Sequence, residues 1–338
     1  MRILICGLGS MGRRHYNNLS NSPIIKVDRG PLAGSPARLD LYAYRTNKST
    51  LKDDFNFKKV FYNFDDIREH THIDGVIISN PTSLHVATAS RLKDLMCPFF
   101  IEKPLSDTLD GVNMLESHFG DKNIPCMLGY HVLFHPCFLK LEELVCDGTI
   151  GEIVSCKAYN GSYLPNWHPW EDYKKSYASN RSLGGGVTLT MIHELNYLTR
   201  LFGTPQDYYG MKTEKNTLGI DVDEGIEILL KHDSGVVSNI HLNFFQQKTE
   251  RWLKITGTKG TLYWDFWSSE IVVNDKIIEF EESPLELLNK SYLDEICHFL
   301  AICSGKLGAR PVQQILGTTL TDGIEDVKIA TTLLEKAV

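Results

Sequence analysis

The sequence predicts an α/β protein of two domains, one built on a parallel sheet and one on a mainly antiparallel open sheet. The chain has 338 residues, more than a single hydrophobic core usually serves. In its first part, short apolar runs alternate with helical patterns, which favours a doubly wound parallel sheet. In its second part, the apolar runs at 224–245 and 251–273 are broken by turn signals instead, which favours antiparallel strands.

The composition is that of a folded globular protein and excludes several classes of partner. Hydrophobic residues make up 42% and charged residues 23%, far from the low-hydrophobicity, high-charge regime of disordered chains. A formal net charge of −7, with no block of like charges, provides no general attraction for nucleic acid or anionic membranes. We therefore expect no nucleic-acid partner and no membrane.

The cysteines and the opening residues bear on the compartment. The eight cysteines are scattered without CxxC pairs, which predicts reduced thiols rather than a disulfide framework. The apolar run that opens the chain breaks at Gly7 and is too short for a membrane span or the core of a signal peptide. Both observations predict a cytoplasmic protein.

A glycine-rich segment follows the first apolar run at once. Gly7, Gly9 and Gly12 stand between a strand-like stretch and a helix-like segment, in the pattern GxGxxG. Such glycines allow a tight turn and a close approach of the backbone to a pyrophosphate, and the helix N-terminus supplies unpaired N–H groups. The pattern predicts a Rossmann-type dinucleotide site, with an ordinary glycine-rich turn as the alternative. Its predicted contacts are Gly7, Gly9, Ser10, Met11 and Gly12.

Further strand-like runs continue the parallel sheet. They lie at 41–45, 75–79, 97–102 and 124–130, with a helical pattern at 85–95. Ligands of such sheets bind at the carboxyl ends of the strands, so we expect the loops 79–85 and 102–106 to contact the cofactor. The cofactor-binding residues predicted there are Asn80, Pro81, His85, Glu102 and Lys103.

Two residues compete for the end of the second strand, where the ribose hydroxyls are bound. Asp28 comes early after the glycines, whereas Arg45 comes late unless the Pro- and Gly-rich stretch between them is an inserted loop. We favour Arg45. A guanidinium there suits a 2′-phosphate, which biases NAD(P) binding toward NADP(H); an arginine stacked over adenine is the alternative.

Several motifs together resemble a known family. They include the glycine turn, Asn80-Pro81-Thr82 with His85, and Glu102-Lys103-Pro104, and the likeness continues through 129–137, 148–158, 184–203 and 253–265. The chain resembles the glucose-fructose oxidoreductase and inositol dehydrogenase (Gfo/Idh/MocA) family. This resemblance implies an NAD(P)-binding Rossmann domain over 1–128 and an α/β domain over 129–338 for substrate binding and oligomerisation. It also implies a homodimer or homotetramer formed through the open sheet of the second domain.

The resemblance assigns two catalytic residues. Lys103 matches a lysine that lies beside the nicotinamide and the substrate hydroxyl, and Pro104 favours a fixed turn over a solvated surface lysine. His193 matches a histidine placed against that lysine. From the residues alone, the apolar spacing over 190–203 predicts one helix with His193 beside its buried face, where a histidine is more often a core residue than a base.

Three positions depart from the family pattern. Thr190 and Asn196 stand where relatives usually carry carboxylates three residues before and after the histidine, on one stripe of the predicted helix. A carboxylate raises the pKa of an imidazole and holds its tautomer, whereas threonine or asparagine does only the second. Leu133 replaces an arginine that relatives often have.

The stretch 161–186 is the predicted substrate loop. It is dense in aromatic rings that suit sugar faces and in side chains that bind hydroxyl, phosphate or carboxylate groups; an aromatic packing loop is the alternative. The substrate-binding residues we predict are Tyr130, Tyr163, Trp167, His168, Asp172, Tyr173, Lys175, Arg181, Thr190 and Asn196. His131 and His135 lack a third ligand nearby in sequence, so we predict packing and capping residues and no metal.

These observations predict an oxidoreductase that moves a hydride between NAD(P) and a carbinol or carbonyl carbon of a sugar-like polyol, including phosphorylated, acidic or nucleotide-linked forms. Lys103 polarises or protonates the oxygen and His193 is the general acid/base. Two alternatives stay open. One is a cofactor-binding sensor or regulatory protein that kept the fold and lost catalysis, and the other is a dehydratase or isomerase that uses NAD(P) transiently.

Overall fold

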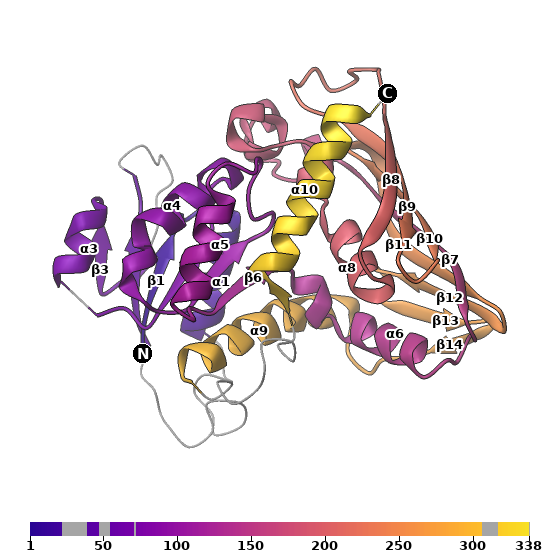
Figure 1. The fold of residues 1–338 in the computed structure, drawn as a ribbon, viewed down its shortest axis with the longest axis horizontal. Helices are drawn as coiled ribbons and strands as arrows, with labels where there is room; N and C mark the ends of the chain where they lie inside the picture. Colours follow the sequence, from indigo (N-terminus) through magenta and orange to yellow (C-terminus); the bar gives the residue numbers. More distant parts are fainter. Residues whose placement is uncertain (22–38, 47–54, 71, 306–316, 338) are drawn as a thin grey trace. The chain divides into compact units, whose positions relative to one another are not determined.

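The computed structural model describes residues 1–21, 39–46, 55–70, 72–305 and 317–337, which fall into two compact units. The first comprises Met1–Tyr130 and Tyr292–Ile324, and the second comprises His131–Ser291 and Glu325–Val338. Helices α9 (Pro284–Cys303) and α10 (Leu320–Lys336) each contribute to both units (Figure 1). The division that we predict after residue 128 assigns everything downstream to one domain, whereas residues 292–324 return to the first unit.

The first unit is built on a parallel sheet. Its seven strands within the described residues have the order β15-β6-β5-β4-β1-β2-β3, and all neighbours are parallel except β15 and β6. The strands are β1 (Arg2–Cys6), β2 (Asp40–Tyr44), β3 (Lys59–Phe61), β4 (Gly75–Ile78), β5 (Phe99–Glu102), β6 (Cys126–Gly129) and β15 (Thr318–Thr319). Residues 3–6 of β1 are all buried, which is why they form a continuous apolar run. The predicted doubly wound parallel sheet is confirmed.

Helices cover both faces of this sheet. They are α1 (Ser10–Asn21), α3 (Phe64–His70), α4 (His85–Leu92), α5 (Val112–Asp121) and the shares of α9 and α10 that belong to this unit. Successive residues of β5 point to opposite faces: Phe99 packs on Phe119 of α5 at 4.9 Å between ring centroids, and Phe100 packs on Phe299 of α9 at 5.6 Å. Gly75 of β4 lets α9 approach, because an added Cβ would lie 3.2 Å from the Phe299 ring.

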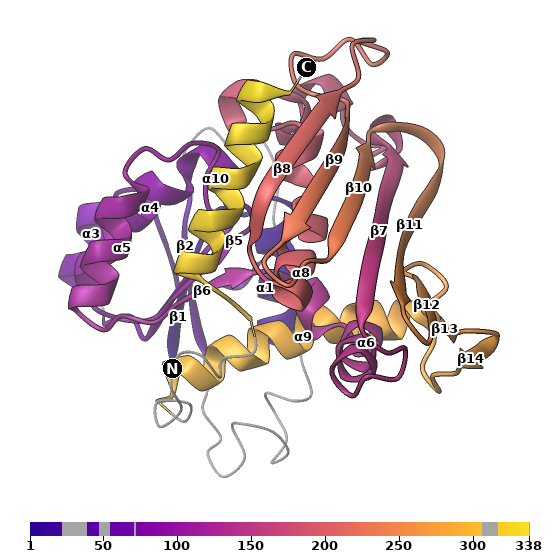
Figure 2. The same cartoon turned by 45° about the vertical axis from the view of Figure 1, so that its right-hand side comes forward.

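The second unit is built on an open sheet. Its eight strands within the described residues have the order β14-β13-β12-β11-β7-β10-β9-β8 (Figure 2), and neighbours are antiparallel except β10 and β7. The strands are β7 (Ile153–Tyr163), β8 (Pro205–Lys212), β9 (Gly225–His232), β10 (Val237–Asn243), β11 (Phe245–Gly257), β12 (Gly260–Asp265), β13 (Glu270–Val273) and β14 (Lys276–Ile278). The predicted mainly antiparallel sheet is confirmed.

Helices pack on one face of this sheet and leave the other face with partly exposed side chains. The helices are α6 (Pro136–Cys146), α7 (Val187–Thr190), α8 (His193–Phe202) and the end of α10, with short 3₁₀ helices η3 (His131–Phe134), η4 (Leu164–Asn166), η5 (Tyr173–Lys175), η6 (Tyr177–Ser179) and η7 (Arg181–Leu183). On the other face, His241, Tyr159 and Trp252 are direct cross-strand neighbours on β10, β7 and β11. Tyr159 stacks on His241 at 4.5 Å and on Trp252 at 5.3 Å, and we call these three residues the aromatic row.

Two surveys of the described residues bear on partners. None of the described helices is long and apolar enough to cross a membrane. The described part of the chain also contains no group of three or more His, Cys, Asp or Glu side chains that could hold a metal ion.

Helix α6 is capped by a buried histidine. Nδ1 of His135 accepts a hydrogen bond from the N–H of Cys137 at 3.2 Å, and the residue is fully buried. Burial, and secondly the positive charge of Arg251, lower the pKa of His135 to about 4. The predicted capping role is confirmed for His135, and its imidazole is neutral near pH 7.

This cap predicts a pH-dependent stability. The unfolded chain protonates His135 near pH 6.5, whereas the folded chain does so only near pH 4. The free energy of unfolding is therefore expected to be highest above pH 6.5 and to lose up to roughly 3 kcal/mol from this residue as the pH falls to 4. Urea unfolding at a series of pH values checks this. His135→Asn keeps a capping acceptor and removes the titration, so an unchanged pH dependence in that variant contradicts the assignment.

Candidate active site

The turn between β1 and α1 uses each of its three glycines differently. Gly7 has a φ of +95°, and a Cβ added to it would lie 2.5 Å from the backbone nitrogen of Asn80. A Cβ on Gly12 would lie 2.0 Å from the carbonyl oxygen of Gly7, so α1 packs on the turn only without a side chain there. Around the added Cβ of Gly9, nothing lies within 4 Å. These are the tight turn, the close helix packing and the open approach that a pyrophosphate site needs.

Other predicted cofactor residues lie at the same edge of the sheet. Ser10 and Met11 form the first turn of α1, where backbone N–H groups have no partners within the helix. Asn80 follows β4 and donates through Nδ2 to Thr88 Oγ1 at 2.8 Å, and Pro81 precedes a short 3₁₀ helix over 82–84. Because β1, β4 and β5 are parallel, the loops after their carboxyl ends meet at this edge.

Arg45 stands at the end of the second strand. The N–H of Gly7 donates to the carbonyl of Tyr44 at 3.1 Å, and Arg45 follows, with its own N–H bonded to Phe61 O at 3.1 Å. Its side chain is half-buried. The competing residue, Asp28, lies outside the described residues. Arg45 thus occupies the position beside the glycine turn at which Rossmann folds bind the ribose or a 2′-phosphate.

His85 joins the loops that follow β4 and β5. Its Nε2 lies 2.8 Å from Asn80 O and its Nδ1 lies 2.9 Å from Pro104 O. Burial lowers the pKa of His85, although both carbonyl oxygens act to raise it. The sequence predicts direct cofactor binding by His85, and the structure places it as a 1% exposed link between the two loops.

The side chain of Glu102, the last residue of β5, points into the interior of the first unit. Its Oε1 lies 2.6 Å from Nε2 of His15, which is fully buried on α1. Glu295 of α9 is also buried, and burial, followed by the charge of Glu102, raises its pKa well above the usual value. The residue before Lys103 is thereby anchored to the helix that begins at the glycine turn. Lys103 itself is half-buried, and its peptide bond to Pro104 is cis.

The predicted helix over 190–203 is interrupted. Helix α7 ends at Thr190, Met191 has the non-helical angles φ −101° and ψ 34°, and α8 begins at His193. Asp223, which lies outside the helix, is hydrogen-bonded to the short α7. Its carboxylate accepts from the N–H of Thr188 at 2.8 Å and from the Thr188 hydroxyl at 2.6 Å. The expectation of one continuous helix, with Thr190 and His193 on one stripe, is therefore wrong.

The His193 ring packs on a second histidine, and Asn196 of the same helix binds a buried carboxylate. His193 is 6% exposed, and its ring packs edge to face on that of His131, with 4.9 Å between centroids and 80° between planes. Asn196 donates to Oδ2 of Asp326 at 2.7 Å, and Asp326, on α10, is 1% exposed. Positions 190 and 196 carry no carboxylate, but Asp326, 130 residues after Asn196 in the chain, places one against α8.

A buried ion pair ties the first turn of α8 to the sheet. Oε1 of Glu194 accepts from Arg251 Nε of β11 at 2.7 Å and from Asn160 Nδ2 of β7 at 3.2 Å. Glu194 is fully buried and Arg251 is 8% exposed. Removing one partner of such a pair leaves an uncompensated buried charge, so the pair resists displacement of α8 and of His193 with it.

Two family models match the chain in succession. The one described as "Oxidoreductase family, NAD-binding Rossmann fold" matches residues 1–130, and the one described as "GFO/IDH/MocA C-terminal domain" matches residues 138–263. The chain belongs to the Gfo/Idh/MocA oxidoreductase family. The resemblance stated from its motifs is confirmed.

Relatives in the Gfo/Idh/MocA family share low identity over most of their length. A myo-inositol 2-dehydrogenase of Thermotoga maritima is 25% identical over 319 residues, which cover 89% of this chain and 87% of the relative. The structure of a Lactobacillus casei scyllo-inositol dehydrogenase with NAD(H) and scyllo-inositol has a TM-score of 0.77 at 21% identity, covering 100% of this chain and 96% of the other. A levoglucosan dehydrogenase with NADH and levoglucosan has a TM-score of 0.83 at 16% identity, covering 100% and 97%.

In this Gfo/Idh/MocA protein, part of the predicted substrate loop is bonded to the protein itself. Trp167 Nε1 donates to Ser162 Oγ at 2.9 Å, and the Tyr173 hydroxyl donates to a backbone carbonyl at 2.9 Å. The Arg181 guanidinium donates to the carbonyl oxygen of Asp221 through Nε at 3.1 Å and Nη2 at 2.8 Å. These contacts favour the packing alternative for the three side chains.

The other predicted substrate residues differ in exposure. Tyr163, at the end of β7, and His168 are half-buried. Asp172 caps η5, and the exposed Lys175 lies 3.9 Å from its carboxylate. Tyr130, after which the chain enters the second unit, is only 1% exposed.

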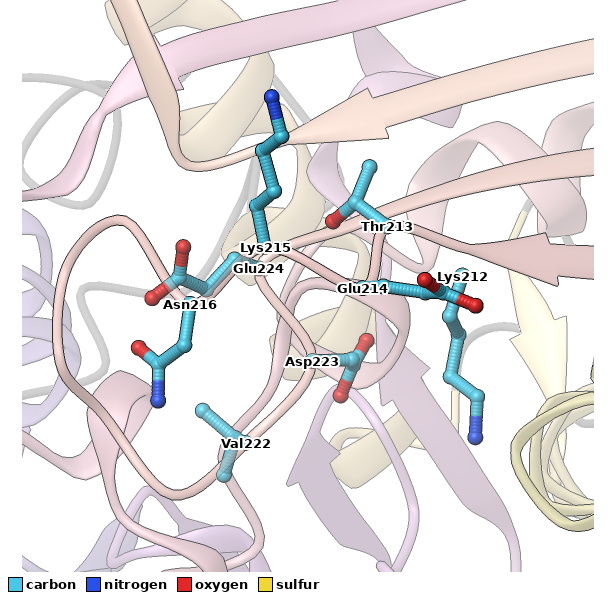
Figure 3. Close-up of a pocket in the computed structure, with 8 residues that line it drawn as sticks. All are labelled: Lys212, Thr213, Glu214, Lys215, Asn216, Val222, Asp223 and Glu224. Carbon is cyan, nitrogen blue, oxygen red and sulfur yellow. The ribbon is translucent and has the colours of Figure 1, made fainter.

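A hollow of about 270 Å³ lies in the second unit. It is lined by the segments 212–216 and 222–224 (Figure 3). Of its carboxylates, Glu224 accepts from the N–H groups of Thr217 at 2.7 Å and Leu218 at 2.8 Å, and Asp223 is bonded to Thr188. Asp223 and Glu224 thus hold neighbouring groups of the fold, and none of the lining residues is a predicted site residue.

Proposed function

We propose that this protein is an NAD(P)-dependent dehydrogenase that transfers a hydride between C4 of the nicotinamide and a carbinol carbon of a sugar-like polyol. The observation that carries the proposal is the construction of one sheet edge in the first unit. There, the open glycine turn follows β1, and the Lys103 turn follows β5. The Lys103 turn is held by His85 through Pro104 and by His15 through Glu102.

The proposed chemistry divides between two side chains. Lys103 polarises the substrate oxygen in the carbonyl state and holds it in the alcohol state, because an ammonium group favours developing negative charge. His193 takes the hydroxyl proton during oxidation and returns it during reduction. When bound, NAD(P)⁺ supplies the hydride acceptor.

The proposed substrate is a polyol or anhydrosugar. The names of the relatives support this class, since they act on inositols or bind levoglucosan. We propose that the more open residues of the loop, Tyr163, His168, Asp172 and Lys175, contact its hydroxyl groups. Trp167, Tyr173 and Arg181 then keep the loop in shape through their own hydrogen bonds.

The proposed assembly is a homodimer or homotetramer formed through the open sheet of the second unit. The aromatic row lies on the same sheet face as Tyr209, Met211 and Leu229, which are 72%, 63% and 50% exposed. An apolar surface of this kind favours a second copy of the chain as its partner. A cytoplasmic location stays part of the proposal.

Steady-state turnover tests the proposed function. The purified protein is incubated with NAD⁺ or NADP⁺ and a panel of inositols, anhydrosugars and sugar acids, and the absorbance of the reduced nicotinamide is followed. We expect reduced cofactor to accumulate with at least one polyol. Tight cofactor binding without turnover of any compound overturns the proposal in favour of a sensor. Product formation without net reduced cofactor overturns it in favour of a dehydratase or isomerase.

The position of Arg45 predicts a preference for NADP(H). Titration of cofactor-free protein with NADPH and NADH, followed by nicotinamide fluorescence, is expected to show tighter NADPH binding. Arg45→Ala removes the charge-assisted bonds to the 2′-phosphate and is expected to weaken NADPH binding by about tenfold or more, with little change for NADH. Equal affinities for both cofactors in the parent protein contradict this role.

A further inference from the structure

The histidine that contacts His193 is His131, and the His131 ring is itself hydrogen-bonded to a serine. His131 and His193 are 7% and 6% exposed, and their rings meet edge to face at 4.9 Å. Nδ1 of His131 lies 3.1 Å from the hydroxyl oxygen of Ser291, on the first part of α9. All three residues belong to the second unit.

The hydroxyl of Ser291 fixes the tautomer of His131. Ser291 Oγ lies 2.7 Å from the carbonyl oxygen of Leu288, a contact in which only the hydroxyl can donate. With its one hydrogen used there, Ser291 can only accept from His131, so Nδ1 of His131 carries a proton. In the neutral ring, Nε2 is therefore the unprotonated nitrogen.

Three ionisable groups on the elements around the two rings have described partners or are held neutral. Glu194, beside His193 on α8, pairs with Arg251 of β11. Asp326 of α10 accepts from Asn196. His135, after η3, is neutral because burial and Arg251 lower its pKa to about 4.

We propose that His131 is a positioning residue for His193, locked by Ser291 in the Nδ1–H tautomer. The packed ring fixes the orientation of the His193 imidazole, a task that carboxylates at 190 and 196 perform by hydrogen bonding in relatives. The inference rests on the proposed function, because the orientation of His193 matters for the reaction only if His193 is the general acid/base.

The test follows the two rings by NMR in the whole protein, without substrate. Histidine labelled with ¹⁵N is incorporated, and the ring nitrogens of His131 and His193 are assigned and followed against pH. In the parent protein, we expect the Nδ1–H pattern for His131. Ser291→Ala is expected to give His131 a mixture of tautomers. His131→Asn, which keeps a donor for Ser291 and removes the packed ring, is expected to change the ring ¹⁵N shifts of His193.

A matched control separates this role from general packing. Ser304 lies near the end of the same helix and also donates to a carbonyl three residues before it, at 2.8 Å from Ala301 O. Ser304→Ala is therefore expected to leave both rings unchanged. An unchanged His131 tautomer in Ser291→Ala, or unchanged His193 ring shifts in His131→Asn, overturns the proposal.

Kinetics then distinguishes failure of this inference from failure of the proposed function. With a polyol substrate, Ser291→Ala is expected to lower kcat roughly tenfold, a modest part of the 10²–10⁴-fold that a positioned acid/base group contributes, with a smaller change in KM. If no polyol is turned over, the proposed function fails, while the NMR result still decides whether His131 positions His193. If turnover is present and all variants retain the parent pH profile, the positioning role fails alone.

Discussion

Lys103→Ala is expected to lower kcat by roughly 10²- to 10³-fold, the loss typical of removing one group that stabilises developing negative charge. Affinity for the cofactor should stay close to that of the parent protein. The reason is that the glycine turn and Arg45, which we assign to the cofactor phosphates and ribose, do not depend on the ammonium group. Initial rates measured from nicotinamide absorbance and dissociation constants measured from its fluorescence check the two expectations separately.

The control for this variant is another lysine of the same unit. Lys122, at the end of α5, is exposed, and Lys122→Ala should leave rate and affinity unchanged. A large loss of cofactor affinity in Lys103→Ala with turnover intact would refute the catalytic assignment. In that case the lysine would belong to the cofactor site.

Gly9→Ala is expected to weaken cofactor binding by at least about tenfold, or 1.4 kcal/mol, without destabilising the protein. The surroundings of the added Cβ are empty within 4 Å, and Gly9 does not have a positive φ, so the folded chain accommodates alanine. The empty volume is what a pyrophosphate needs for close approach to the backbone. Cofactor titration together with thermal unfolding measures both effects.

Gly120→Ala provides the matched comparison. Gly120 lies in α5, and its added Cβ also meets nothing within 4 Å. This variant should leave both cofactor affinity and the melting temperature close to the parent values or raise the latter slightly, because alanine favours a helix over glycine. If Gly9→Ala binds cofactor as well as Gly120→Ala does, the open space at Gly9 is not the pyrophosphate site.

The parts of the fold that the sequence predicts are those with local signatures. Continuous apolar runs mark β4 and β5 because both faces of a parallel strand are buried. GxGxxG marks the turn because Gly7 and Gly12 leave no room for a side chain, while Gly9 leaves the backbone open to a ligand. The predicted helix over 85–95 corresponds to α4 and the 3₁₀ turn Lys93–Leu95 that follows it. In these cases the information lies within a few residues of the element itself.

The site features that sequence reasoning missed depend on partners far apart in the chain. Glu102 has a motif position beside Lys103, but its bond to His15 spans 87 residues. Asp326 reaches Asn196 across 130 residues, and Asp223 holds α7 across 35. The apolar spacing that predicted one helix over 190–203 carried no sign of this outside anchor. A single sequence gives the residue types of such pairs but does not show that the two residues are in contact.

The return of residues 292–324 to the first unit has a consequence for the order in which the protein is completed. Thr318 and Thr319 of β15 pair with Leu128 and Met127, and Gly323 allows α10 to lie against Leu128, where an added Cβ would come within 1.8 Å. On the ribosome, all of β7 to β14 emerges before these residues do. The β6 edge of the nascent first unit therefore has no β15 partner until these residues have been synthesised. A fragment cut at residue 130 retains the whole glycine turn and still lacks the last strand of its own sheet.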